Sequence, residues 1–180
     1  MEPEKPGARY RQSGVSSASR AMNLDRQPGS YILILACDKS EEASIGKRLS
    51  MTIEPGYYCY VGSALGPGGL AARLGHHTRP VVRPHWHIDY LRSYTRLIEI
   101  WYGYGRQHRE CDWTHILQSI GELYVPIKGF GATDCTCSSH LMYSSTRPDV
   151  EQFKHIVMKQ ITGLADIKCI NMESGEDGNG

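Results

Sequence analysis

Residues 29–37 read GSYILILAC and residues 56–66 read GYYCYVGSALG, and these two stretches decide the expected fold. Both are rich in β-branched or aromatic residues and are bounded by turn-forming or charged residues, which is typical of buried strands. The second run passes into a Gly/Pro-rich loop and then into residues 70–78, which we predict to be helical. The foldable part of the chain therefore opens with two strands and a helix.

The later segments alternate between the same two kinds of element. Residues 85–94 favour a short helix and residues 96–104, RLIEIWYGY, a third strand. Residues 110–123 favour a helix because their apolar residues recur with a 3.6-residue period. Residues 149–161 favour a last helix, since a proline and an aspartate stand at its start. This order predicts an α+β fold with a small central antiparallel sheet of three strands, flanked by helices.

The composition indicates one domain with polar ends. Of the 180 residues, 40% are hydrophobic, which is enough for one core. Residues 1–28 carry five basic and three acidic groups without apolar periodicity, so we expect a disordered arm. Residues 163–180 carry one basic and four acidic groups, and we expect a disordered acidic tail. Residues 29–162 remain as the domain.

The expected cellular location follows from the lack of a recognisable membrane span and signal peptide in the sequence. No apolar run approaches the roughly 18 residues of a membrane span, and no signal peptide is recognisable, so we expect a cytoplasmic protein. Six cysteines in such a chain indicate reduced thiols or metal ligands instead of a disulfide framework. The formal net charge of +1 excludes no class of partner by itself.

The two strands carry short tripeptides that resemble a known family. Residues 29–31 (GSY) and residues 60–62 (YVG) are similar to the paired tripeptides that name the GIY-YIG nuclease superfamily. Arg73 then follows in the expected helix, His77 lies four residues on, and Glu110 begins a later helix. These three resemble the arginine, the His-or-Tyr and the metal-binding glutamate of that family.

Longer strings resemble the Uri-type branch, whose members are sometimes fused to base-excision DNA glycosylases: GYYCYVGSALG, HWHIDYL and GFGATDCTCSSHL. The resemblance implies a GIY-YIG-like fold and an endonuclease that uses Mg²⁺ or Mn²⁺ to cut DNA, with DNA repair enzymes as possible associates. The distance between Tyr31 and Tyr60 exceeds that in compact members of the family. Residues 38–55 are therefore expected to form an inserted hairpin or loop between the two motif strands.

Each matched residue suits one part of phosphodiester hydrolysis. Glu110 would bind Mg²⁺, which keeps several waters and takes its other ligands from the substrate. Arg73 would hold phosphoryl oxygens with its planar fork of donors. Tyr60 would act as the general base or orient the attacking water, with Tyr31 positioning it. A nearby arginine and a cation can lower the pKa of such a phenol. His77 would hold or deprotonate the water.

The segment from residue 73 to residue 96 adds a second histidine and a basic strip. His87 and Asp89 are expected to form an oriented pair or proton relay, with three apolar neighbours in the core: Trp86, Ile88 and Leu91. Basic residues beside a catalytic helix suit nucleic-acid backbones, although such a run is also typical of an ordinary solvated face. Three arginines are expected to contact DNA: Arg79, Arg83 and Arg92.

A thiol-rich loop offers a separate metal site. Cys135, Cys137 and His140 have Cys-x-Cys-x₂-His spacing, and Cys111 could supply a fourth ligand for structural Zn²⁺. The alternatives are small buried thiols in a Gly-rich loop, or an Asp134 and His140 that line the active site.

Two other functions stay open from the sequence. One is a catalytically weak DNA-binding or repair-accessory module, because Ser63 stands where many relatives of this type have lysine. The other is a zinc-stabilised interaction domain, which the cysteine cluster favours.

Overall fold

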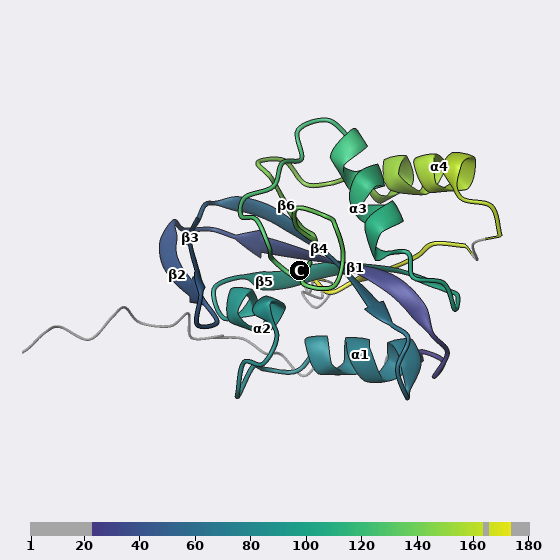
Figure 1. The fold of residues 1–180 in the computed structure, drawn as a ribbon, viewed down its shortest axis with the longest axis horizontal. Helices are drawn as coiled ribbons and strands as arrows, with labels where there is room; N and C mark the ends of the chain where they lie inside the picture. The colour runs from purple at the N-terminus through teal and green to yellow at the C-terminus, as the bar shows by residue number, and fades with distance from the viewer. Residues whose placement is uncertain (1–22, 164–165, 174–180) are drawn as a thin grey trace, which may run out of the picture.

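The computed structural model describes residues 23–163 and 166–173, and these form an α+β fold around one five-stranded antiparallel sheet (Figure 1). The strand order in the sheet is β6-β4-β1-β5-β7. Its strands are β1 (Gly29–Cys37), β4 (Gly56–Ala64), β5 (Arg96–Tyr104), β6 (Leu141–Ser144) and β7 (Lys168–Asn171). The helices in the described residues are α1 (Gly69–His77), α2 (His87–Arg92), α3 (Glu110–Ser119) and α4 (Val150–Gln160). The α+β class and the antiparallel sheet are thus as predicted.

The expected three-stranded sheet was wrong in the number of strands. The three predicted strands form its centre, but β6 pairs with one end of β4 and β7 pairs with β5. Both added strands have four residues, and β7 lies in the segment expected to be a disordered acidic tail. Its sequence, KCIN, has no apolar alternation, because an edge strand is held by backbone hydrogen bonds and buries little. The helix expected over residues 110–123 also ends early, at Ser119.

The insertion between the first two motif strands is a hairpin, one of the two forms expected for residues 38–55. It consists of β2 (Glu41–Ile45) and β3 (Leu49–Ile53), which pair only with each other. Alternate residues of the hairpin are buried, and they pack into the same core cluster as α1 and α2. This alternation turns the polar side of the hairpin to solvent.

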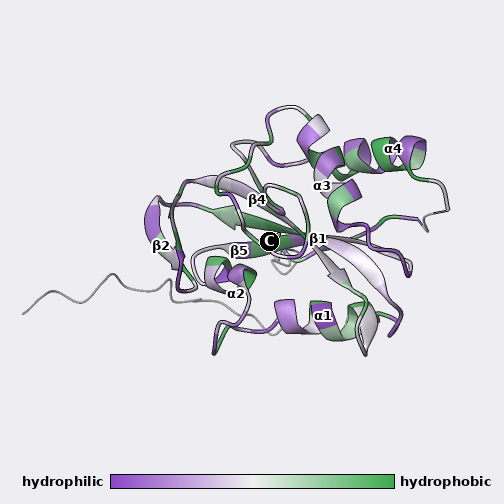
Figure 2. Cartoon of the chain, in the orientation of Figure 1, coloured by the Kyte–Doolittle hydropathy of each residue, from purple (hydrophilic) through white to green (hydrophobic). Residues whose placement is uncertain are grey.

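Two cores lie on opposite faces of the sheet (Figures 1 and 2). One face carries Tyr31, Leu33 and Leu35 of β1 and is covered by α1, α2 and the hairpin. The other carries Ile32 and Ile34 and is covered by α3 and α4. Because β1 is paired on both sides, its residues are buried on both faces, as the continuous apolar run predicted.

The register between β1 and β4 sets the tyrosines on one face. Tyr31 lies opposite Gly62, and Leu33 lies opposite Tyr60. Since side chains alternate along a strand, Tyr31 and Tyr60 are diagonal neighbours on the α1 side of the sheet.

The described part of the N-terminal arm contacts the domain. The backbone carbonyl of Gln27 accepts a hydrogen bond from the Leu70 N–H at 2.9 Å, and that of Pro28 accepts one from Gly105 at 2.9 Å. Leu24 packs against the core. The rest of the expected arm, residues 1–22, and residues 174–180 of the expected tail lie outside the described residues. Within the described residues, no helix has the length and apolar character needed to cross a membrane.

Gly62→Ala is expected to destabilise the protein by about 1–3 kcal/mol, the usual range for overpacking a core. A Cβ at residue 62 would lie 2.4 Å from the Tyr31 hydroxyl oxygen, so the buried Tyr31 ring would have to move. Urea unfolding measures the change in the free energy of unfolding.

Gly75→Ala is the matched control, because nothing lies within 4 Å of a Cβ built at this α1 residue. Alanine is the better helix former there, so this variant is expected to be as stable as the wild type or more stable. A Gly62→Ala protein with wild-type stability would contradict the close packing of β4 on Tyr31.

Candidate functional site

Tyr31 and His77 form a buried hydrogen-bonded pair at the centre of the candidate site. The Tyr31 hydroxyl oxygen lies 2.8 Å from His77 Nε2, and both side chains are almost fully buried. Tyr31 comes from the central strand, and His77 is the last residue of α1. The apolar contacts of Leu70 and Leu74 with the sheet fix the helix that carries His77. The structure therefore joins two residues that the sequence predicted from different elements.

Burial keeps both motif tyrosines protonated. It raises the pKa of Tyr31 well above its ordinary value and raises the pKa of Tyr60 to about 12. The charge of Arg73 lowers both pKa values, as the sequence led us to expect, but burial outweighs it. The charge of Glu110 raises both. Arg73 and Glu110 thus act on the same pair of phenols, although they come from α1 and α3.

His77 is neutral in this environment. Burial, followed by the charges of Arg92 and His76, lowers the pKa of His77 from 6.5 to about 3. Its Nδ1 atom is buried and has no hydrogen-bond partner among the described residues. Depending on its tautomer, a neutral imidazole can accept a hydrogen bond from the Tyr31 hydroxyl at Nε2 or donate one from Nε2 to the phenol oxygen. This side chain therefore serves to hold Tyr31 by a hydrogen bond.

Arg73 lies at the solvent-facing side of the site. Its guanidinium carbon is 4.5 Å from the centroid of the Trp86 ring, a cation–π contact. The two side chains line a shallow cleft together with His76 and the loop that leads into α1: Ala64, Gly66, Pro67, Gly69 and Ala72. Trp86 was expected in the core and is instead 37% exposed, whereas Ile88 and Leu91 are buried as expected.

Asp89 pairs with His76, and the expected pairing with His87 was wrong. Asp89 Oδ1 lies 3.0 Å from His76 Nε2, and its Oδ2 accepts hydrogen bonds from the N–H groups of His85 and Trp86. These bonds hold the pKa of Asp89 below its ordinary value, although burial acts to raise it. The carboxylate thus anchors the start of α2 to the end of α1.

His87 faces a different part of the molecule. Its Nδ1 atom accepts a hydrogen bond from the Gly131 N–H at 3.3 Å, and its ring packs on Phe130. His87 turns toward that loop because one helical residue separates it from Asp89, which points to α1. The structure gives His87 a part in holding the loop of Phe130 and Gly131.

The basic strip is divided between surface and interior. Arg79 and Arg83 are exposed, as expected for residues that contact DNA. Arg92 is only 6% exposed; it donates a hydrogen bond to the Arg79 carbonyl and lies 3.7 Å from Asp89 Oδ1. The expectation that Arg92 contacts DNA was therefore wrong, because its guanidinium is used to tie α2 to the end of α1.

Glu110 begins α3 beside a histidine of the thiol-rich loop. Its Oε2 atom lies 4.0 Å from His140 Nδ1, and its side chain is 28% exposed. Among the described residues, no lysine or arginine forms an ion pair with it. The carboxylate is thus open to solvent on one side and electrostatically coupled to the tyrosines on the other.

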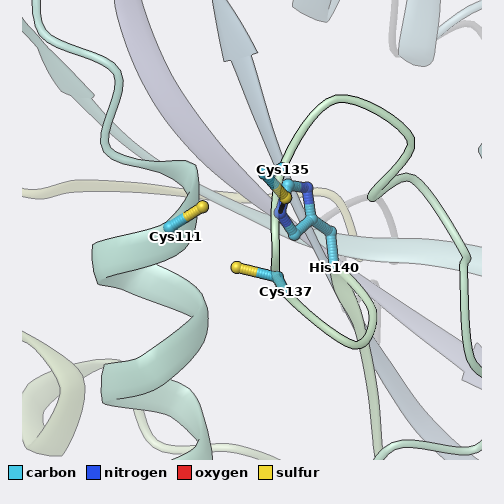
Figure 3. A group of neighbouring side chains, drawn as sticks. All are labelled: Cys111, Cys135, Cys137 and His140. Carbon is cyan, nitrogen blue, oxygen red and sulfur yellow. Dashed lines mark hydrogen bonds between the residues drawn. The ribbon is translucent and has the colours of Figure 1, made fainter.

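The predicted Cys/His ligands meet in space and could hold a metal ion such as zinc (Figure 3). The donor atoms of Cys111, Cys135, Cys137 and His140 all lie within 4.8 Å of one another. Cys111 extends from α3 toward Cys137, and Cys135 lies against the His140 ring. Burial raises the pKa of Cys137 to about 12, and hydrogen bonds with the other two thiols raise it as well. The exposed Asp134 contributes no ligand to this group.

The sequence missed the contacts that depend on a third element. The sequence suggested no role for His76, which precedes the buried His77 at the end of α1. It nevertheless reaches Asp89 across α2, and with His77 these residues place three donor atoms within 4.8 Å. His77 is bonded to Tyr31, and Asp89 accepts from two backbone N–H groups, so hydrogen bonding already accounts for this second group. No residue spacing in the sequence predicts this contact between His76 and Asp89.

His77→Gln is expected to make the stability less sensitive to acid. The unfolded wild-type chain gains a proton at His77 below pH 6.5, whereas the folded chain does so only near pH 3. The stability that the neutral imidazole contributes is thus complete above pH 6.5. It falls by up to about 1.4 kcal/mol for each pH unit below that.

Urea unfolding of both proteins, from neutral pH down to mildly acidic pH, measures the difference. His115→Gln, at an exposed position on α3, is the control and should keep the wild-type pH dependence. Parallel pH dependences for His77→Gln and the wild type would show that His77 is not buried in its neutral form.

Comparison with known proteins places the chain in a family without assigning an activity. Neither the curated proteins nor the solved structures include a significant match. A family described as "Domain of unknown function DUF123" matches residues 30–163, which run from the first motif strand through α4. The match spans well over half of the chain. This chain therefore belongs to the DUF123 family.

Proposed function

We propose that this chain is an endonuclease of the GIY-YIG type, in its Uri-type branch, which uses a divalent cation to hydrolyse phosphodiester bonds in DNA. The observation that carries the proposal is geometric: Tyr31 and His77 form a buried hydrogen bond of 2.8 Å, and the His77 ring neighbours Trp86, which borders the cleft together with Arg73. The charges of Arg73 and Glu110, which act on both Tyr31 and Tyr60, support it. These residues come from β1, β4, α1 and α3, and no common structural need brings a cation, a carboxylate and two phenols together. Perturbed titratable groups gathered from several elements are typical of functional sites.

Arg73 is the group that would hold the scissile phosphate. Its guanidinium stacks on the exposed Trp86 ring and borders the cleft, so it can reach a ligand in solvent. The proposed substrate is therefore bound through its phosphates at the cleft that Arg73 and Trp86 line.

Glu110 is the residue that would hold Mg²⁺ or Mn²⁺. A partly exposed carboxylate that forms no ion pair with lysine or arginine among the described residues suits a hard cation, which binds through few carboxylates and keeps its waters. Such a cation polarises a phosphoryl oxygen and makes a bound water more acidic. The cysteine cluster is a poor site for Mg²⁺, since thiolates prefer softer metals. The proposal thus needs the catalytic cation at Glu110, with structural Zn²⁺ as a separate site.

The two tyrosines would divide the work of orienting water. Tyr60 is only partly buried, whereas Tyr31 is enclosed and fixed by His77. We assign the contact with the attacking water to Tyr60 and its positioning to Tyr31. With its pKa near 12, Tyr60 is a hydrogen-bond donor at neutral pH, and it can accept a proton only when positive charge nearby lowers that pKa.

The proposed partner is DNA, held by the exposed Arg79 and Arg83 in the segment between α1 and α2. Association with DNA repair enzymes is part of the same proposal, since it follows from the Uri-type resemblance. Arg92 has no place in this surface, because it is buried and bonded within the domain.

Glu110→Gln and Arg73→Ala are each expected to reduce DNA cleavage by about a hundredfold or more, the usual loss when a group that stabilises transition-state charge is removed. Purified protein is incubated with supercoiled plasmid and branched DNA, with Mg²⁺, Mn²⁺ or EDTA, and the products are resolved on gels. Cleavage is expected only with a divalent cation.

The matched controls are Glu151→Gln on α4 and Arg48→Ala in the hairpin turn, both at exposed positions. They should cleave like the wild type. A wild type that binds DNA but leaves every substrate intact would favour the DNA-binding module over the nuclease. Equal cleavage by Glu110→Gln and the wild type would remove Glu110 from the mechanism.

Arg83→Ala is expected to weaken DNA binding and to reduce the slope of log K against log salt by about 0.9, the contribution of one phosphate contact. Fluorescence anisotropy with labelled duplex over a range of salt concentrations gives the slope. Arg48→Ala should leave it unchanged, and an unchanged slope in Arg83→Ala would place the DNA elsewhere.

A further inference from the structure

We infer that Cys111, Cys135, Cys137 and His140 form a structural zinc site that holds the loop of residues 129–140 against α3 and thereby positions Glu110. The zinc site stands on the geometry of these four residues. The role of Glu110 in binding the catalytic cation is the part that rests on the proposed function.

The four donor atoms lie close enough together to be drawn onto one zinc ion. Zinc bonds of about 2.0–2.3 Å place the ligand atoms of a tetrahedron about 3.5–3.8 Å apart. Here all four donors lie within 4.8 Å of one another, and Cys135 Sγ is 3.3 Å from His140 Nε2. The cysteines are free thiols, and Cys₃His is one of the common ligand sets of structural zinc. Small movements of side chains are enough to close the site.

The backbone of the loop holds three of the ligands in place. The Gly129 N–H donates to the Ser138 carbonyl at 2.7 Å, and the His140 N–H donates to the Phe130 carbonyl at 2.8 Å. These bonds close the loop on itself, with Cys135 and Cys137 between them. The His140 carbonyl accepts a hydrogen bond from Val61 at 2.9 Å, so the loop is also fixed to β4.

Cys111 is the ligand that joins this loop to a different element. It lies in the first turn of α3, next to Glu110, and its side chain extends toward Cys137 (Figure 3). In the described part of the chain no backbone hydrogen bond outside the regular elements ties the first turn of α3 to this loop. A metal ion bound to all four side chains would supply that connection.

The same ion would act on the proposed active site through His140. With Nε2 on zinc, the imidazole carries its proton on Nδ1, which faces Glu110 Oε2 at 4.0 Å. A carboxylate beside a zinc-bound histidine is a recurrent arrangement that fixes both groups. The loop also packs on Tyr60, because a Cβ at Gly131 would lie 2.9 Å from that ring. Zinc would thus restrain neighbours of both Glu110 and Tyr60.

The first experiment measures zinc and needs no DNA. Protein purified without chelator is analysed by inductively coupled plasma mass spectrometry, and we expect one zinc per chain in the wild type. Cys137→Ser and Cys111→Ser should lose it, whereas Cys169→Ser, at an exposed cysteine outside the cluster, should keep it. Circular dichroism checks that each variant is folded.

Two measurements on the wild type avoid dependence on the variants. Removal of the metal with a strong chelator should lower the Tm, since an ion that binds only the folded state stabilises it. Cobalt added to the stripped protein should give the thiolate-to-metal charge-transfer band of a tetrahedral site. A wild type without stoichiometric zinc and without this band, or with a disulfide among these cysteines, would overturn the zinc site.

The second experiment tests the effect on Glu110. Mn²⁺ binding is measured by electron paramagnetic resonance in the zinc-loaded wild type, in Cys137→Ser and in Glu110→Gln. We expect Glu110→Gln to abolish the site and Cys137→Ser to weaken Mn²⁺ binding by about tenfold, the lower end of losses seen when groups that orient metal ligands are removed.

Wild-type Mn²⁺ affinity in zinc-free Cys137→Ser would overturn the positioning of Glu110 and leave the zinc site intact. Zinc in the wild type together with a failure to cleave any DNA would contradict the proposed nuclease but not the zinc site. The two proposals therefore fail by different observations.

Discussion

Antiparallel pairing of β1 with β4 in a single register is the constraint from which the candidate site follows. A shift of this pairing by one residue would place Tyr31 and Tyr60 on opposite faces of the sheet. The observed register is enforced on both sides of β1, because two separate cores each take alternate residues of it. Gly62 then leaves the room that the Tyr31 ring occupies. The position of the phenols is thus set by packing across the whole sheet.

Apolar patterns were sufficient to predict β1 and α3, whose continuous run and 3.6-residue period reflect how much of each element is buried. The hairpin was expected only as one form of an insertion, from the distance between Tyr31 and Tyr60. β6 is apolar and buried but only four residues long, which is too short for a period to be recognised. β7 is a polar edge strand held by backbone hydrogen bonds, which are available to any sequence and leave little trace in composition.

The resemblance to a nuclease family supplied candidate residues but not their surroundings. It named Arg73 and Tyr60, and the spacing of the loop named Cys135 and Cys137. Whether a side chain is free depends on elements far away in the sequence, as the burial of Arg92 against Asp89 illustrates. The protonation state of a buried side chain likewise depends on the elements that surround it, and no local sequence pattern shows which elements these are. A basic residue in a basic strip can therefore be structural, while its neighbours remain exposed.

The position of residues 23–28 has a consequence for any module joined to the N-terminal side of this domain. Gln27 is bonded to the first turn of α1, and a Cβ at Gly69 would lie 2.1 Å from its carbonyl oxygen. The chain thus crosses the domain directly beside the residues that line the Arg73 cleft. A module joined on the N-terminal side of residue 23 would therefore be tethered beside this cleft, which raises its effective concentration there.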